Sequence, residues 1–193
     1  MDDSKSKSMI NKEVSRIIQS RHSVYPLDFN GCEIEDDIVL QILKNANHAP
    51  THRLTQPWLF KIFSKSSKMK LLSEITKLNG DFTLEKKAQL EYNFNQSSHI
   101  ICVCMHRNLQ NIVPEWEEIA ATAMSVQNIW ISCVDSNIGG YWSTPKYVDQ
   151  LNNFLSLKKN ERCLGLFYLG VHDSKPKRNV RRKDIDEKIE WFR

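Results

Sequence analysis

The stretch Asn137-Ile138-Gly139-Gly140-Tyr141-Trp142-Ser143-Thr144-Pro145 follows the longest helical stripe of apolar residues in the chain. Its two glycines adopt backbone conformations that side chains would forbid, so the sequence predicts that a helix over 115–137 ends at this point. The apolar residues of that helix recur at helical spacing: Ile119, Ala123, Val126, Trp130 and Val134. The glycine pair alone is a weak signal, because it lacks the spacing of a dinucleotide-binding G-x-G-x-x-G loop.

On either side of this stretch, apolar periodicity predicts an alternation of helices and strands. Helices are predicted over 12–20, 35–46, 65–78 and 147–155, and strands over 58–63, 99–105 and 162–171. Residues 81–96 are polar and too weakly patterned for an assignment, and 184–192 are predicted to form a terminal helix or extension. The pattern favours an α+β fold, with one domain over residues 11–193 behind a flexible N-terminus over 1–10.

Composition is that of an ordinary globular protein, with 193 residues, 40% hydrophobic and 26% charged, and a net charge of +4. The basic residues are spread widely, which argues against nucleic-acid binding. The exception is a cluster near the C-terminus, Lys175, Lys177, Arg178, Arg181, Arg182 and Lys183. It is either a solvated charge run or a cluster that faces a phosphate.

The chain shows no membrane or secretion signal, because no stretch approaches the ~20 apolar residues of a membrane span and Met1–Met9 lack a signal-peptide core. The five cysteines are odd in number and sit in apolar runs, so we expect no disulfide framework and a cytoplasmic location. Cys102 and Cys104 should share one face of a strand as buried small hydrophobes. His99 and His106 flank them without a zinc-site spacing, so no metal site is expected.

Arg21-His22-Ser23 is a candidate phosphate site. Arginine offers a planar fork to phosphate oxygens and the serine hydroxyl adds a donor, while His22 contributes through its backbone. The alternative is an Arg-His pair that ends a helix and caps its carbonyls. A second segment, Ala49-Pro50-Thr51-His52-Arg53-Leu54-Thr55-Gln56-Pro57-Trp58, is a non-helical connector after His48. His48 and His52 are either site residues one helical turn apart or two surface histidines.

In this order, the three motifs resemble the cofactor frame of the flavin-dependent nitroreductase family, and most closely its short, single-domain bacterial branch. The resemblance runs from about Val14 to the end of the chain. It implies a central mixed, mainly antiparallel sheet flanked by helices, in a homodimer that binds FMN. Arg21, His22 and Ser23 would then hold the phosphate and ribityl end, although His22 stands where a second arginine is commoner.

The resemblance assigns roles to further residues. His52, with His48 on the same side, would reach the partner subunit's flavin, and Trp58 would be buried core beside the site. Trp142, Ser143 and Thr144 would lie along the isoalloxazine and ribityl groups. Close relatives often carry arginine where this chain has Ser143, and the missing charge would come from Arg181 or Arg182.

The function that the resemblance implies is an FMN-dependent oxidoreductase. It would take hydride from NADH or NADPH and then reduce a nitroaromatic, a quinone or a related electron-poor acceptor, in a ping-pong cycle at one site. No protein residue is expected to be catalytic, since the cofactor carries the chemistry. Two alternatives stay open: dehydrogenation or dehalogenation of a specialised metabolite, decided by residues 79–96, and a non-enzymatic flavin-binding protein.

Overall fold

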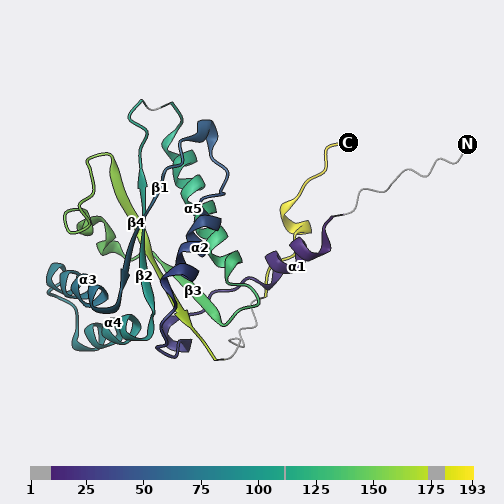
Figure 1. The fold of residues 1–193 in the computed structure, drawn as a ribbon. Coiled ribbons are helices and arrows are strands. Elements are labelled where there is room, and N and C mark those ends of the chain that lie inside the picture. The colour runs from purple at the N-terminus through teal and green to yellow at the C-terminus, as the bar shows by residue number, and fades with distance from the viewer. Residues whose placement is uncertain (1–9, 111, 174–180) are drawn as a thin grey trace, which may run out of the picture.

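The computed structural model describes residues 10–110, 112–173 and 181–193, so the predicted flexible N-terminus falls almost entirely outside the described part. A sheet of four strands lies between two layers of helices (Figure 1). The elements are α1 (Lys12–Ser20), η1 (Pro26–Asp28), α2 (Asp36–Ala46), η2 (His52–Leu54), β1 (Trp58–Ser64), α3 (Lys65–Leu78), α4 (Leu84–Gln96), β2 (His99–His106), α5 (Glu115–Ser132), β3 (Ile138–Ser143), η3 (Lys146–Leu151), β4 (Glu161–Val171) and η4 (Asp186–Lys188).

The strand order is β1-β2-β4-β3, and every strand pair of the described chain is antiparallel. The α+β prediction is confirmed, but the described strands form no mixed sheet. Strands β2 and β4 lie in the middle, and a register shift interrupts their pairing between Val103 and Cys104. The glycine pair sits in the edge strand β3, where Gly140 faces Leu169 of β4.

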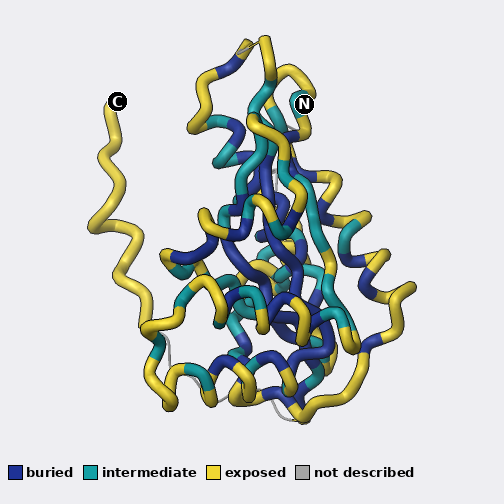
Figure 2. The backbone as a smooth tube through the Cα atoms, turned by 90° about the vertical axis from the view of Figure 1, so that its left-hand side faces the viewer, coloured by how far each residue is buried: buried dark blue, intermediate teal, exposed yellow. Residues whose placement is uncertain are grey.

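The two faces of the sheet bury separate apolar cores, because side chains alternate along each central strand. On one face, Cys102 and Cys104 pack with residues of α3, α4 and η3, as the sequence predicts for these two thiols. On the other face, Val103 and Phe167 pack against α2 and α5. Figure 2 shows the central strands buried and the helices exposed on their outer sides. Coverage on both faces explains the uninterrupted apolar run of β2.

Three stretches differ from the prediction. The helix predicted over 147–155 is the shorter 3-10 turn η3 (Lys146–Leu151). Helix α5 ends at Ser132 instead of 137, since Asp135 adopts a left-handed backbone with φ of 60°, and the glycines lie in a strand. The unassigned stretch 81–96 contains α4, whose first turn is capped by the Thr83 side chain accepting from the Lys86 N–H (3.2 Å). Only Leu90 and Phe94 of α4 are buried, which is too narrow a stripe for periodicity to detect.

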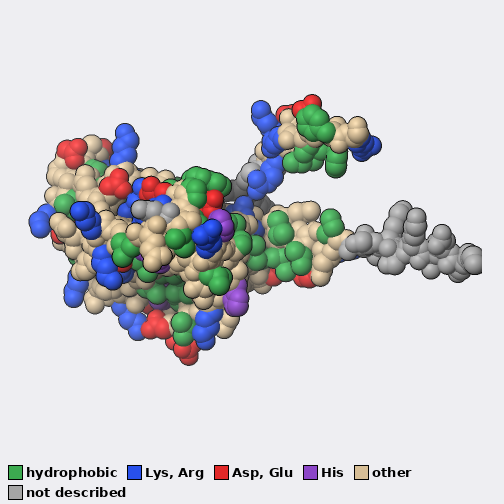
Figure 3. Space-filling model, turned by 90° about the horizontal axis from the view of Figure 1, so that it is seen from above, with side chains coloured by type: hydrophobic (Ala, Val, Ile, Leu, Met, Phe, Trp, Pro, Cys, Tyr) green, Lys and Arg blue, Asp and Glu red, His purple; other side chains and the backbone are tan. Residues whose placement is uncertain are grey.

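The two ends of the described chain project away from the sheet (Figure 1). Helix α1 exposes Val14 and Ile18, and the final segment, an extension with only the short η4 turn, exposes Trp191 and Phe192. Figure 3 shows hydrophobic side chains on both projections. Apolar surface that gathers in this way is typical of contact with another molecule.

Replacing Gly140 by alanine should lower the free energy of unfolding by about 1–3 kcal/mol, the usual cost of overpacking a core. A Cβ at this position would overlap the Phe167 ring, which lies inside the core and cannot move freely. Urea denaturation followed by circular dichroism measures the change. The control is Gly80→Ala, where an added Cβ meets no atom within 4 Å. Equal losses in the two variants would contradict the packing argument.

Candidate functional site

Two of the three sequence motifs lie side by side in the structure. The Val24 N–H donates to the Gly140 carbonyl at 3.1 Å, and the Tyr25 ring stacks on Tyr141 with centroids 4.4 Å apart. The segment after α1 therefore runs along the edge strand β3. Gly139 permits this approach, because a Cβ there would overlap the Val24 side chain.

A cavity of about 800 Å³ opens beside this contact, within the size range of cofactor sites. It is bounded by the segment after α1, the C-terminal end of α5 and the start of β3. The predicted site residues Arg21, His22, Ser23 and Arg182 all line it. Ile138 and Gly139 of the glycine motif line it too. Sequence reasoning missed its other walls, which are Gln19, Ser20, Val24, Tyr25, Trp130, Cys133, Val134, Asp135, Ser136 and His172.

The cavity accumulates positive charge. Burial, followed by the charge of Arg182, lowers the pKa of the Arg21 guanidinium below its ordinary value. Asp135 also lines the cavity, but its carboxylate pairs with Arg16 at 2.6 Å. Neither Arg21 nor Arg182 forms an ion pair with another described residue. Two neighbouring guanidiniums without carboxylate partners suit a polyvalent anion such as a phosphate.

His22 lines this cavity, where the sequence suggests a contribution through its backbone. Its Nδ1 lies 3.0 Å from the Ser20 carbonyl, which can only accept, so Nδ1 carries the hydrogen. The other ring nitrogen, Nε2, is buried and finds no partner among the described residues. Such an orphaned polar atom is costly in a finished core, and it fits a ligand that supplies the missing hydrogen bond.

The thiol in the cavity wall is unreactive. Burial raises the pKa of Cys133 to about 12, so the sulfur stays protonated at neutral pH. The Cys133 thiol also lies 3.3 Å from the Ile129 carbonyl, to which it donates. The cavity thus combines anion-binding cations with a thiol that offers no nucleophile.

The predicted residues at the end of β3 lie outside the cavity walls. Trp142 packs against the core face that α2 and α5 cover, and its ring crosses close to Gly165. Ser143 is half-buried and Thr144 is exposed. The structure thus extends the strand from the cavity toward these three residues without bringing their side chains to Arg21.

His48 and His52 lie elsewhere. Helix α2 ends at Ala46, so the helical relationship predicted between the two histidines is wrong. His48 is exposed and lines a second hollow of about 720 Å³ between α2 and the edge strand β1. The His52 Nδ1 lies 2.6 Å from a carboxylate oxygen of Glu117, at the opposite end of α5 from the cavity.

The distance along α5 separates His52 from the cavity of its own chain. Glu117 and Trp130 stand about 20 Å apart along the helix axis, at 1.5 Å per residue. The buried Trp58 lies near His48 and donates from Nε1 to the Asn47 side chain at 2.9 Å, which agrees with its predicted core position. His52 is therefore separated from Arg21 within one chain by most of the length of α5.

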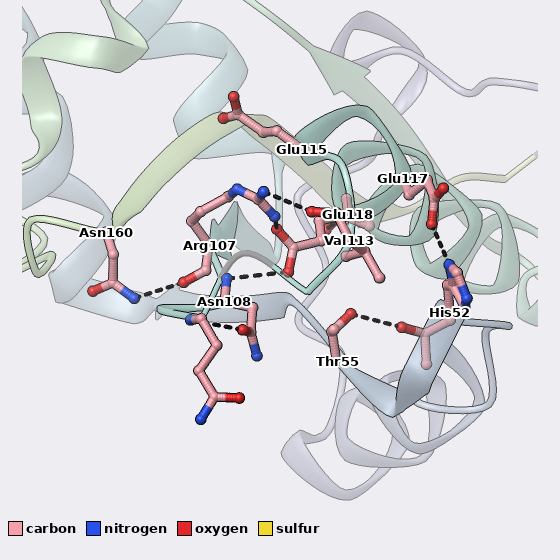
Figure 4. A network of polar contacts seen from close by, with 12 residues as sticks. His52, Thr55, Arg107, Asn108, Val113, Glu115, Glu117, Glu118 and Asn160 are labelled. Atoms are coloured by element: carbon pink, nitrogen blue, oxygen red, sulfur yellow. Dashed lines mark hydrogen bonds and ion pairs between the residues drawn. The ribbon is translucent and has the colours of Figure 1, made fainter.

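A buried polar network fixes the loops at the N-terminal end of α5 (Figure 4). The Glu118 carboxylate is fully buried and accepts from the Arg107 guanidinium and from the Asn108 N–H at 3.1 Å. Arg107 also donates to the Val113 carbonyl at 2.6 Å, and Asn160 donates to the Arg107 carbonyl at 2.8 Å. The sequence signal for this network is weak: it is the acidic pair Glu117 and Glu118 near the start of the helix predicted over 115–137.

Residues 18–171 match the family described as the Nitroreductase family. The chain belongs to the nitroreductase family. The Bacillus subtilis (strain 168) protein named "Putative NAD(P)H nitroreductase YfhC" is 26% identical over 167 residues, which cover 83% of this chain and 84% of that protein. The family membership of this chain confirms the resemblance drawn from the three motifs. It also confirms the assignment of the chain to the oxidoreductases of this family.

Solved structures share the nitroreductase fold. A nitroreductase-like family protein from Bacillus cereus superimposes with a TM-score of 0.78 at 26% identity, covering 96% of this chain and 98% of that one. A variant of the FMN and NADPH-dependent nitroreductase NfnB from Sphigopyxis sp. strain HMH superimposes with a TM-score of 0.74 at 15% identity. The superposition covers 92% of this chain and 97% of that one. The four antiparallel strands and their flanking helices are thus the nitroreductase arrangement.

Two further findings concern the described residues of this nitroreductase. None of their helices has the length and apolar character needed to cross a membrane. Within the same residues, no group of three or more histidine, cysteine or acidic side chains is arranged to hold a metal ion.

Replacing Glu118 by alanine should lower the free energy of unfolding by about 3–5 kcal/mol, because it leaves the Arg107 charge without its buried partner. Urea denaturation gives the value. Glu115→Ala is the matched control on the same helical turn, since Glu115 pairs with Arg162 at 3.0 Å with the side chains 50% and 42% exposed. That exposed pair should contribute no more than about 1 kcal/mol. Similar losses in both variants would refute the distinction.

Proposed function

We propose that this protein is an FMN-dependent oxidoreductase. It takes hydride from NADH or NADPH and delivers it, in a second half-reaction, to an electron-poor acceptor such as a nitroaromatic or a quinone. The observation that carries the proposal is the pair of guanidiniums, Arg21 and Arg182, which have no carboxylate partner among the described residues and lie in a cavity of cofactor size. Family membership and the FMN and NADPH dependence named for NfnB support it.

The residues of the cavity fit the phosphate end of FMN. Arg21 presents a planar fork, Arg182 adds a second positive charge, and the Ser23 hydroxyl and orphaned His22 Nε2 offer further hydrogen-bonding positions. The strand that continues through Trp142, Ser143 and Thr144 would lie along the ribityl chain and the ring. When bound, FMN supplies the two-electron hydride chemistry, and the protein supplies position and charge.

The proposed active form is a homodimer. His52 lies about 20 Å along α5 from the Arg21 cavity of its own chain, so it would approach the flavin of the partner subunit, with His48 on the same side. The apolar side chains of α1 and of the final segment stay exposed in one chain, where a second copy would cover them. Arg181 lies in that segment beside Arg182, and in the dimer it would add to the charge near the phosphate.

The visible spectrum of the purified protein tests the cofactor and the reaction class together. We expect flavin absorption bands that NADH or NADPH bleaches without oxygen and that a quinone or nitroaromatic then restores. Stoichiometric recovery of colour by the acceptor would measure the second half-reaction directly. A yellow protein that neither nucleotide bleaches would contradict the oxidoreductase and favour a flavin-binding protein.

Replacing Arg21 by alanine should weaken FMN binding by about 10- to 150-fold, since a charge-assisted hydrogen bond contributes about 1.5–3 kcal/mol. Fluorescence titration of the apoprotein gives both dissociation constants. Riboflavin, which lacks the phosphate, should bind the wild type and Arg21→Ala equally well. A matching loss of riboflavin affinity would show that Arg21 acts on the fold instead.

Sedimentation velocity should show a dimer that holds two flavins. The expectation follows from the separation of His52 and Arg21 within one chain, which leaves each cavity incomplete without a second copy. A stable monomer that retains FMN at full affinity would refute the proposed arrangement.

A further inference from the structure

We propose that Trp130 is a positioning residue for phosphate recognition: its indole ring is the platform that orients the Arg21 guanidinium toward the anion. The inference rests on the proposed FMN site and adds a residue to it. Sequence periodicity places Trp130 in the apolar stripe of α5, where its expected role is core packing alone. The structure gives its ring a second role at the cavity wall.

The geometry of the pair is that of a cation–π contact. The Arg21 Cζ lies 5.4 Å from the centroid of the Trp130 ring, within the ~6 Å over which such contacts are attractive. Arg21 forms no ion pair with another described residue, so the ring is the contact that directs its guanidinium. Tryptophan is the strongest aromatic partner for a guanidinium.

The ring itself is held in place on two sides. Its Nε1–H donates to the Gly140 carbonyl at 2.8 Å, and its ring forms a T-shaped contact with the Phe167 ring at a centroid distance of 5.3 Å and an interplanar angle of 66°. The same Gly140 carbonyl accepts the Val24 N–H. The platform and the segment that carries Arg21 are therefore anchored to one peptide group.

An aromatic platform orients an arginine without consuming its donors. A carboxylate in the same position would also hold Arg21, but it would neutralise the charge and compete with phosphate for the N–H groups. Orientation also matters because Arg182 lies in the same cavity, and two flexible guanidiniums would otherwise separate by repulsion. Trp130 thus holds the Arg21 guanidinium in an orientation that binds a phosphate dianion. Its effect on affinity should be confined to ligands that carry phosphate.

The experiment measures dissociation constants of FMN and riboflavin for wild type, Trp130→Leu, Trp130→Phe, Arg21→Ala and the double variant Arg21→Ala/Trp130→Leu. Trp130→Leu should weaken FMN binding about 3- to 30-fold, the range expected for a cation–π contact, and leave riboflavin unchanged. Trp130→Phe keeps an aromatic face and should recover most of the loss. With Arg21 already replaced, removing the ring should have no further effect on FMN.

Three outcomes would overturn the platform. They are equal losses of FMN and riboflavin affinity in Trp130→Leu, an unchanged FMN affinity in that variant, and full additivity with Arg21→Ala. Trp116→Leu is the matched control, an exposed tryptophan in the first turn of the same helix, and it should alter neither constant. A wild type that binds riboflavin as tightly as FMN would refute the proposed phosphate site itself, whereas a preference for FMN that is undiminished in Trp130→Leu refutes only the platform.

Discussion

The Gly140 carbonyl is the contact on which the candidate site depends. It accepts the Val24 N–H at 3.1 Å and the Trp130 Nε1–H at 2.8 Å, which uses both lone pairs of one oxygen. These two bonds join the segment after α1, the C-terminal end of α5 and the edge strand β3. Residue 140 must lack a side chain, because a Cβ would enter the space of the Phe167 ring. Core packing around Gly140 therefore determines the position of the cavity and of Arg21 in its wall.

The two ends of α5 differ in how the nearby charges are compensated. At the N-terminal end, the buried Glu118 is matched by Arg107 and by a backbone N–H, so the charge is neutralised and the surrounding loops are fixed. At the C-terminal end, Arg21 and Arg182 face a cavity whose one acidic wall residue, Asp135, is engaged by Arg16. The negative end of the helix dipole offsets part of the repulsion between the two guanidiniums, by roughly 0.3–1 kcal/mol for each charge. One end of α5 thus carries a neutralised polar network, and the other end borders a cavity with two guanidiniums.

Local periodicity predicted most of the fold, and its failures have identifiable causes. Strands β1, β2 and β4 were placed to within one residue at each end because their runs are apolar and continuous. Strand β3 was missed because two glycines leave no alternating pattern, and only pairing with β4 defines it. At the site, the resemblance assigned Arg21 and the segment that contains the glycine pair to one cofactor, and the structure brings these two segments side by side. The role proposed for Trp130 could not be predicted, because helical spacing indicates which face of a helix is buried and not which hydrogen bonds its side chains form.

The loop that carries His52 combines a strained backbone with an exposed imidazole. Arg53, Leu54 and Gln56 all adopt left-handed backbones, with φ of 50°, 52° and 43°. Each such residue costs of order 1 kcal/mol, and the conformation persists only where the surroundings enforce it. Here the Thr51 hydroxyl accepts the Gln56 N–H at 3.1 Å and Glu117 holds the His52 ring. Nothing in the chain's own cavity uses this strained arrangement, yet it holds an imidazole rigidly at the surface. In the proposed dimer, the flavin edge of the second subunit would contact this surface, and the strained loop would then have a function. The loop is therefore the strongest structural argument for the proposed dimer.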